Sequence, residues 1–216
     1  MKAVIFDMDG VISDTQHIYS AAESKVMEEY GIYVDPEEMA RRFSGVSDVD
    51  QFGQLFREVG QSMPPIEEIV QKRNALMAGA HIKVVPGASE IIKMLHDRMI
   101  PMAVASGSAL DYIDFVLEEL ALRPLFSAIA SGNEVANGKP APDVFLLAAK
   151  RLRVAPSDCV VIEDGLHGMM GAKAAGMFCV GLLTHVTENE SPADVNVHNL
   201  TDLTLEILGI SAPEKM

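Results

Sequence analysis

Short apolar runs rich in Val, Ile and Ala recur along the chain and alternate with segments of helical periodicity. The runs cover residues 2–6, 100–105, 128–130, 159–162 and 178–182. Strands that are apolar on both sides are typical of a parallel sheet that helices cover on both faces. The pattern therefore predicts an α/β fold built on a doubly wound, Rossmann-like parallel sheet.

One long stretch interrupts this alternation. Residues 15–84 carry four helical patterns, at 18–30, 36–43, 48–59 and 65–80, with glycines at the turns between them. They predict an inserted four-helix domain over 15–84 and a core domain made of residues 1–14 and 85–216. After the last long strand we expect a polar loop over 187–197 and a short helix over 203–208.

The composition limits the partners of such a protein. Asp and Glu number 31 against 17 Lys and Arg, a formal charge of -14, and the basic residues are scattered. Nucleic-acid binding needs clustered positive charge, so we expect no such partner. No apolar run approaches the roughly 18 residues of a membrane span, so no membrane association is expected. Cys159 and Cys179 lie in apolar runs, which predicts buried thiols and a cytoplasmic location.

Pairs of carboxylates follow two of the predicted strands. Asp7 and Asp9 follow the first strand, and Glu163 and Asp164 follow the strand at 159–162. Ligands of open parallel sheets bind beyond the carboxyl ends of the strands, and crowded carboxylates need a counter-charge. Mg²⁺ prefers oxygen ligands, so Asp7, Asp164 and a backbone carbonyl would suit it. The alternative is that Asp7 and Asp9 are ordinary turn residues.

Two further segments bear groups that could hold an anion. Ser106 and Gly107 follow the strand at 100–105, and a hydroxyl beside free backbone amides can bind phosphate oxygens. The alternative is that Ser106 caps the next helix. Lys139 stands between Gly138 and Pro140, a rigid setting that would place its ammonium at a fixed point. The alternative there is a solvated surface lysine.

Together these segments resemble the four ordered motifs of the haloacid dehalogenase superfamily. The matching segments are residues 4–15, 105–108, 138–143 and 162–177, so the resemblance covers nearly the whole chain. The insert at 15–84 is similar in position to the helical cap of the phosphatase and beta-phosphoglucomutase subgroup. The resemblance implies a magnesium-dependent phosphatase acting on a small phosphorylated metabolite such as a sugar phosphate. A sugar phosphomutase is the alternative.

The resemblance also implies the catalytic roles. Asp7 would be the nucleophile that forms an aspartyl-phosphate and would bind the metal. Asp9 would be the general acid and then the general base, with its backbone carbonyl on the metal. Lys139 would offset negative charge on Asp7 and on the phosphoryl group.

The remaining roles implied by the resemblance concern binding. Ser106 and the Gly107 amide would bind phosphoryl oxygens. Asp164 would be a direct metal ligand, and Glu163 would support the site from behind the ligands.

The segment at 42–48 resembles the cap loop that faces the core site in beta-phosphoglucomutases. Its candidate substrate residues are Arg42, Gly45 and Ser47. Those mutases usually carry basic residues where Ser44 and Asp48 stand, and without these charges a second phosphate would be poorly held. This difference favours a hydrolase over a mutase. The alternative for the loop is a plain connection between two helices.

Two other classes remain as alternatives. Receiver domains of signalling proteins also place an acidic cluster, a hydroxyl and a lysine at strand ends, but they have no insert comparable to residues 15–84. A binding module that keeps only the fold is the other. We expect a monomer or a weak dimer.

Overall fold

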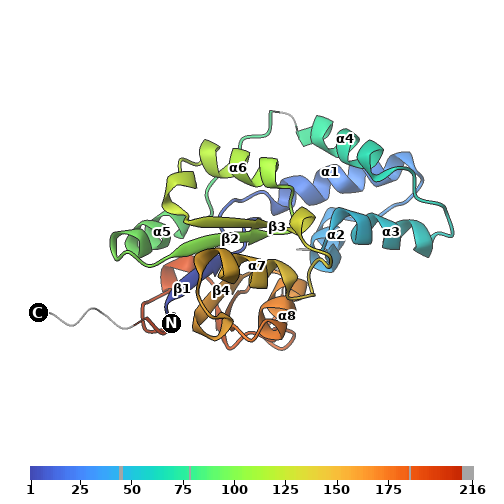
Figure 1. The fold of residues 1–216 in the computed structure, drawn as a ribbon. Coiled ribbons are helices and arrows are strands. Elements are labelled where there is room, and N and C mark those ends of the chain that lie inside the picture. The colour runs from blue at the N-terminus through green and yellow to red at the C-terminus, as the bar shows by residue number, and fades with distance from the viewer. Residues whose placement is uncertain (44–45, 78, 185, 211–216) are drawn as a thin grey trace, which may run out of the picture.

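The core of the molecule is a single parallel sheet (Figure 1). The computed structural model describes residues 1–43, 46–77, 79–184 and 186–210. The strands are β1 (Ala3–Phe6), β2 (Met102–Ser106), β3 (Ala128–Ser131), β4 (Cys159–Glu163), β5 (Phe178–Leu182) and β6 (Val195–Val197). They are ordered β3-β2-β1-β4-β5-β6, and every neighbouring pair is parallel. The predicted doubly wound parallel sheet is confirmed.

Helices cover both faces of this sheet. In chain order the α-helices of the described residues are α1 (Gln16–Glu29), α2 (Pro36–Phe43), α3 (Asp48–Glu58), α4 (Ile66–Met77), α5 (Ala88–Asp97), α6 (Leu110–Glu119), α7 (Asp143–Leu152) and α8 (Leu166–Ala174), and it is α5–α8 that pack against the sheet. Val4 and Phe6 of β1 pack in one core cluster with α5 and α6, whereas Ala3 and Ile5 pack in the other with α7 and α8. Successive side chains of a strand point to opposite faces, so β1 is apolar throughout because both of its faces are buried. Within the described ranges, every helix is too short or too polar to span a bilayer.

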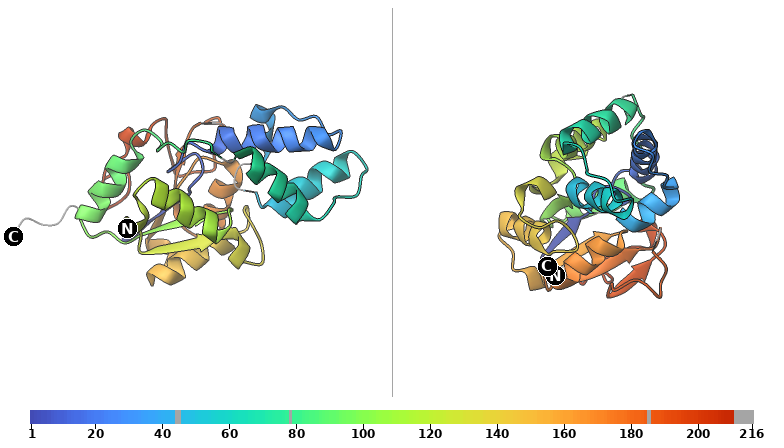
Figure 2. Two further views of the ribbon diagram at one scale, coloured as in Figure 1. Left: turned by 90° about the horizontal axis from the view of Figure 1, so that it is seen from above. Right: turned by 90° about the vertical axis from the view of Figure 1, so that its right-hand side faces the viewer.

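The first four helices form an insert with a hydrophobic cluster of its own. That cluster contains Val26, Met27, Ile32, Met39, Phe43, Phe52, Leu55, Phe56 and Ile69. The views agree that α1–α4 gather at one end of the sheet (Figures 1 and 2). The chain leaves and re-enters the core through two adjacent segments, because Asp14 N–H donates to Lys83 O (2.8 Å) and Val85 N–H donates to Ile12 O (2.9 Å). We call α1–α4 the helical insert.

The C-terminal part differs from the expectation in two places. The loop predicted over 187–197 is wrong at its end, where residues 195–197 form β6 beside β5. This strand is only Val-Asn-Val, too short to show an alternating pattern. The helix predicted over 203–208 is also wrong: a 3-10 turn at Leu200–Asp202 is followed by hydrogen-bonded turns. Thr204 Oγ1 accepts the Ile207 N–H (3.2 Å), as an N-cap residue does, but Gly209 at φ +60° ends the segment after a single turn.

Candidate active site

A lysine and two carboxylates form a buried ion pair network at the carboxyl edge of the sheet. Asp7 directly follows the central strand β1, and its N–H donates to Ile162 O (3.0 Å). Lys139 Nζ lies 2.5 Å from Asp7 Oδ1 and 2.7 Å from Glu163 Oε1. Burial and the neighbouring charge of Glu163 raise the pKa of Asp7, although Lys139 opposes the shift. One ammonium therefore does not neutralise all the negative charge gathered here.

Asp164 adds a third carboxylate, and the group fits a divalent cation. Asp7, Glu163 and Asp164 can each present an oxygen within 4.8 Å of the others. Asp164 Oδ2 accepts a hydrogen bond from Thr184 Oγ1 (3.1 Å), while its buried Oδ1 has no partner among the described residues. Burial raises the pKa of Asp164 well above its usual value. An unsatisfied buried carboxylate oxygen costs free energy, and Mg²⁺ would satisfy it with the ligand type it prefers.

Glu163 is placed to support this site. Its Oε1 accepts from Lys139, and its Oε2 accepts the N–H of Gly165 (2.6 Å). Both oxygens are thus engaged with the protein. This leaves Asp7 and Asp164 as the better-placed side-chain ligands for a metal, and the supporting role of Glu163 stays a prediction.

The turn after β1 reaches Asp164 through a glycine. Gly10 has φ +86°, a conformation that other residues rarely adopt. A Cβ atom at this position would lie 2.1 Å from Asp164 Oδ2, which is well inside van der Waals contact. A side chain at position 10 would therefore displace the Asp164 carboxylate or the turn that carries Asp7 and Asp9.

The Asp9 carboxylate is held by hydroxyl groups. Its Oδ1 accepts from Thr15 Oγ1 (2.6 Å), and its Oδ2 accepts from Ser108 Oγ (3.2 Å) and Ser106 Oγ (3.5 Å). Burial raises the pKa of Asp9, against these hydrogen bonds. A carboxyl group with a raised pKa is suited to carry and return a proton. Sequence reasoning assigned no contact to Thr15 or Ser108, because both hydroxyls reach Asp9 only through the fold.

The loop after β2 is held in place by the neighbouring strand. Ser108 N–H donates to Ser106 Oγ (3.1 Å), and Ser131 Oγ, at the end of β3, donates to Ser108 O (2.6 Å). Ser106, Gly107 and Ser108 all line the cavity described next. The loop thus brings hydroxyls and backbone to the same place as Asp7 and Asp9, where they could bind the oxygens of a phosphoryl group.

A cavity of about 640 Å³ lies between the sheet edge and the helical insert. The core supplies Asp7, Asp9 and Ser106 to its lining. The insert contributes residues of α1, α3 and α4 to the same lining. Tyr19 of α1 and Tyr112 of α6, both in its lining, contact each other edge to face, with ring centroids 5.4 Å apart. The volume suits a small metabolite.

The candidate residues of the insert loop are separated by the structure. Arg42 lies in α2 and pairs with Glu58 (2.5 Å) and Glu38 (3.4 Å), and the described cavity lining does not include it. Ser47 does line the cavity, and its Oγ accepts the Asp50 N–H (3.2 Å) as the N-cap of α3. Gly45 lies outside the described residues.

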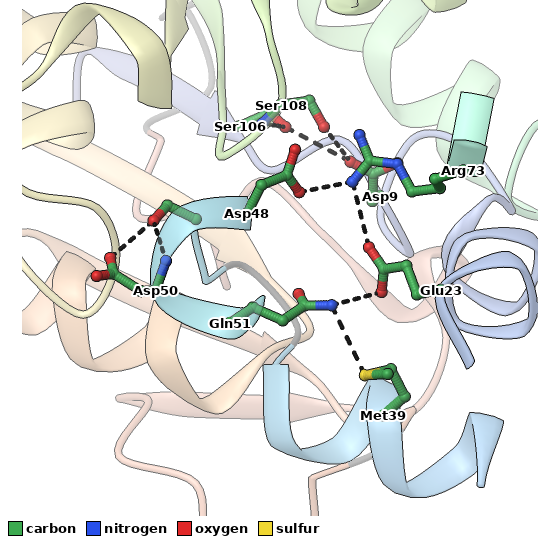
Figure 3. A network of polar contacts seen from close by, with 10 residues as sticks. Asp9, Glu23, Met39, Asp48, Asp50, Gln51, Arg73, Ser106 and Ser108 are labelled. Atoms are coloured by element: carbon green, nitrogen blue, oxygen red, sulfur yellow. Dashed lines mark hydrogen bonds and ion pairs between the residues drawn. The ribbon is translucent and has the colours of Figure 1, made fainter. Parts of the chain in front are cut away.

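A cation that sequence reasoning missed lies on the insert side of the cavity. Arg73 of α4 is buried and pairs through Nη1 with Asp48 Oδ1 (2.6 Å) and Glu23 Oε1 (3.3 Å) (Figure 3). Its guanidinium also lies over the Tyr19 ring, 5.0 Å from the centroid. In the sequence Arg73 stands in an ordinary charged helical pattern, so only the packing of α4 against α1 identifies it. The lack of basic residues at positions 44 and 48 therefore does not leave the insert side of the cavity without a cation.

Comparisons with known proteins agree with this geometry. Residues 4–182 match the family model described as haloacid dehalogenase-like hydrolase. A beta-phosphoglucomutase of Bacillus subtilis is 34% identical over 217 residues, covering 96% of this chain and 94% of that protein. A phosphorylated carbohydrates phosphatase of Thermotoga maritima is 34% identical over 179 residues, covering 82% of each chain. A crystal structure of a hydrolase from Pseudomonas syringae superposes with a TM-score of 0.87 at 26% identity, covering 98% of this chain and 100% of that chain.

The family model spans most of the chain, and both named relatives align over most of their own length. The chain therefore belongs to the haloacid dehalogenase-like hydrolase family and is an enzyme of the phosphoric monoester hydrolase type.

Proposed function

We propose that this protein is a magnesium-dependent phosphatase that hydrolyses a small phosphate monoester through an aspartyl-phosphate on Asp7. The observation that carries the proposal is the pair of unlike carboxylates at one cavity. Burial raises the pKa of both, but Asp7 is bonded to the Lys139 ammonium (2.5 Å), which favours its ionised form, whereas Asp9 is held by neutral hydroxyls. Two carboxyl groups in such different settings suit a nucleophile and a proton carrier.

The proposed reaction has two steps, transfer of the phosphoryl group to Asp7 and then to water. A carboxylate oxygen of Asp7 attacks phosphorus, the bond from phosphorus to the ester oxygen breaks, and Asp9 gives its proton to the departing alkoxide. Asp9 then takes a proton from water, whose oxygen attacks phosphorus and releases inorganic phosphate and the Asp7 carboxylate. Lys139 offsets charge on Asp7, and Ser106 and the Gly107 amide bind phosphoryl oxygens.

Asp7, Asp164 and the Asp9 backbone carbonyl are the groups proposed to hold Mg²⁺. When bound, the cation would offset negative charge on the phosphoryl group. The orphaned Oδ1 of Asp164 supports this assignment.

We further propose that residues 15–84 are a cap domain on a core formed by residues 1–14 and 85–216. The separate hydrophobic cluster of the insert and the adjacent connecting segments support this division. The substrate proposed for the cavity between them is a sugar phosphate. The name of the Thermotoga maritima relative supports this class, and that of the Bacillus subtilis relative makes a sugar phosphomutase the second candidate.

Phosphate release from a panel of phosphorylated sugars, polyols and nucleotides tests the proposal. We expect release with Mg²⁺, none with chelator, and at least about a thousandfold loss in Asp7→Asn, whose melting temperature serves as the folding control. Unchanged release by Asp7→Asn would refute the nucleophile. Isomerised glucose phosphate formed only with a bisphosphate primer would establish the mutase instead.

A further inference from the structure

The insert side of the cavity holds a cation that the protein has already neutralised. Arg73 Nη1 lies between Asp48 Oδ1 (2.6 Å) and Glu23 Oε1 (3.3 Å), and Figure 3 shows both carboxylates turned toward this nitrogen. The side chains of Arg73 and Glu23 are only 8% and 9% exposed, so water screens their interaction little. Above pH 7, where Glu23 is ionised despite the raised pKa that burial gives it, these three groups carry one positive and two negative charges.

The arrangement is held from several sides. Glu23 accepts from Arg73 through Oε1 and from Gln51 Nε2 through Oε2 (2.7 Å), so both of its oxygens are engaged. The Tyr19 ring packs against the guanidinium at 5.0 Å. Arg73 can therefore not move toward an incoming anion without breaking buried contacts, which would cost free energy.

The same residues still offer hydrogen-bonding groups to a ligand. Both ion pairs of Arg73 use Nη1, which leaves Nη2 as a donor among the described contacts. Asp48 uses Oδ1 in the ion pair and its side chain is 37% exposed, which leaves Oδ2 as an acceptor. The side-chain hydrogen bonds of Gln51 to Glu23 and Met39 both start from Nε2, which leaves Oε1 as another acceptor. All three residues line the cavity. We call Glu23, Asp48, Gln51 and Arg73 the insert polar cluster.

This mixture of donors and acceptors matches hydroxyl groups. A hydroxyl both donates and accepts, so neighbouring hydroxyls of a sugar or polyol can use Arg73 together with Asp48 or Gln51. An ionised phosphate or carboxylate only accepts, and here it would meet two carboxylates around a shared cation. The cluster lines the same cavity as Asp9 and Ser106, so the body of an ester whose phosphate lies at Asp7 would face it.

We propose that the insert polar cluster selects phosphate monoesters with a neutral, polyhydroxylated body and discriminates against a second phosphate or carboxylate. This inference rests on the proposed phosphatase function and gives it a substrate class. It also disfavours the mutase, because the bisphosphate intermediate of a phosphomutase would place its second phosphate against Glu23 and Asp48.

The test compares two substrates that differ by one phosphate, with p-nitrophenyl phosphate as a reference ester that has no hydroxyl groups. At pH 8, where Glu23 is ionised, we expect wild-type kcat/KM for glucose 6-phosphate to exceed that for glucose 1,6-bisphosphate by at least about tenfold. The Glu23→Gln/Asp48→Asn double variant leaves Arg73 uncompensated and should lower this ratio about tenfold. Asp48→Asn alone, at the more exposed position, should move the ratio in the same direction.

Arg73→Gln tests the binding of sugar hydroxyls rather than the rejection of a second phosphate. We expect its kcat/KM for glucose 6-phosphate to fall about tenfold more than that for p-nitrophenyl phosphate. The matched control is Arg57→Gln, at an exposed arginine of the same insert, which should leave every ratio as in the wild type. A merely structural role would change all three esters in parallel.

Two different results would overturn this inference, and only one of them also overturns the proposed function. Equal wild-type use of the monophosphate and the bisphosphate, with p-nitrophenyl phosphate hydrolysed, would overturn this inference and leave the phosphatase standing. Failure of the wild type to hydrolyse any of the three esters with Mg²⁺ would overturn the proposed function and this inference with it.

Discussion

Replacing Lys139 by Met should destabilise the protein strongly as well as inactivate it. The Lys139 side chain is 1% exposed, and its ammonium is the hydrogen-bonded cation between Asp7 and Glu163. Methionine has a similar length and no charge, so the substitution leaves two buried carboxylates without their counter-ion. Removing one partner of a buried ion pair typically costs roughly 3–5 kcal/mol.

The expected loss for Lys139→Met is therefore about 4 kcal/mol in the free energy of unfolding, a large share of the ~5–15 kcal/mol that stabilises a typical domain. Chemical denaturation at pH 7 in the presence of chelator measures it. The chelator is needed because a bound divalent cation would offset part of the same charge. Lys150→Met, at an exposed lysine of α7, is the matched control and should change stability by less than about 0.5 kcal/mol.

A double variant separates lost charge pairing from lost packing. Glu163→Gln in the Lys139→Met background removes one of the stranded carboxylates, so it should recover part of the loss. A loss below about 1 kcal/mol in Lys139→Met would refute the reasoning, since the ammonium would then not compensate buried charge. Additive losses in the double variant would show that Lys139 and Glu163 act independently.

Two further substitutions test the turn after β1 and the insert polar cluster. Gly10→Ala would place an alanine at a positive φ with its Cβ against Asp164. We expect the free energy of unfolding to fall by about 2 kcal/mol and the activity to respond more weakly to Mg²⁺. An unchanged Mg²⁺ titration would contradict the role of this turn. Burial raises the pKa of Glu23 from 4.5 to about 7, so its contribution to stability is complete below pH 4.5 and is lost as the pH rises through 7. Between pH 4.5 and 8 the wild type should lose about 3 kcal/mol that Glu23→Gln does not lose, at roughly 1.4 kcal/mol per pH unit; parallel stability curves from denaturation at several pH values would contradict this.

The parallel sheet was predictable because most of its strands are continuous apolar runs, buried on both faces of the sheet. β5 was predicted at its observed bounds, and β1, β2 and β4 within two residues of theirs. β6 was missed because three residues carry no periodicity. The helix expected over 203–208 was wrong for a different reason, since the N-cap Thr204 and Gly209, which has a positive φ, leave only a single turn between them.

The candidate site, too, could be predicted only in part. Asp7, Asp9 and Asp164 could be placed together because each follows a strand, and parallel strands end at one edge of the sheet. Arg73 could not be placed, because nothing in its own helix shows that it pairs with Glu23 and Asp48 of other helices. Contacts that depend on how helices pack carry no local sequence signal, and Arg73 makes such contacts on the insert side of the cavity.

The covalent intermediate is the most direct test of the central claim. In Asp9→Asn, p-nitrophenyl phosphate should still phosphorylate Asp7, because p-nitrophenolate leaves without a proton, whereas attack by water should be slow without the general base. Acid quenching with Mg²⁺ present and mass spectrometry of the digest should then show one phosphoryl group on the peptide that contains Asp7, and none in Asp7→Asn/Asp9→Asn. Release of phosphate without this adduct, or an adduct on another residue, would contradict the assignment of Asp7 as the nucleophile.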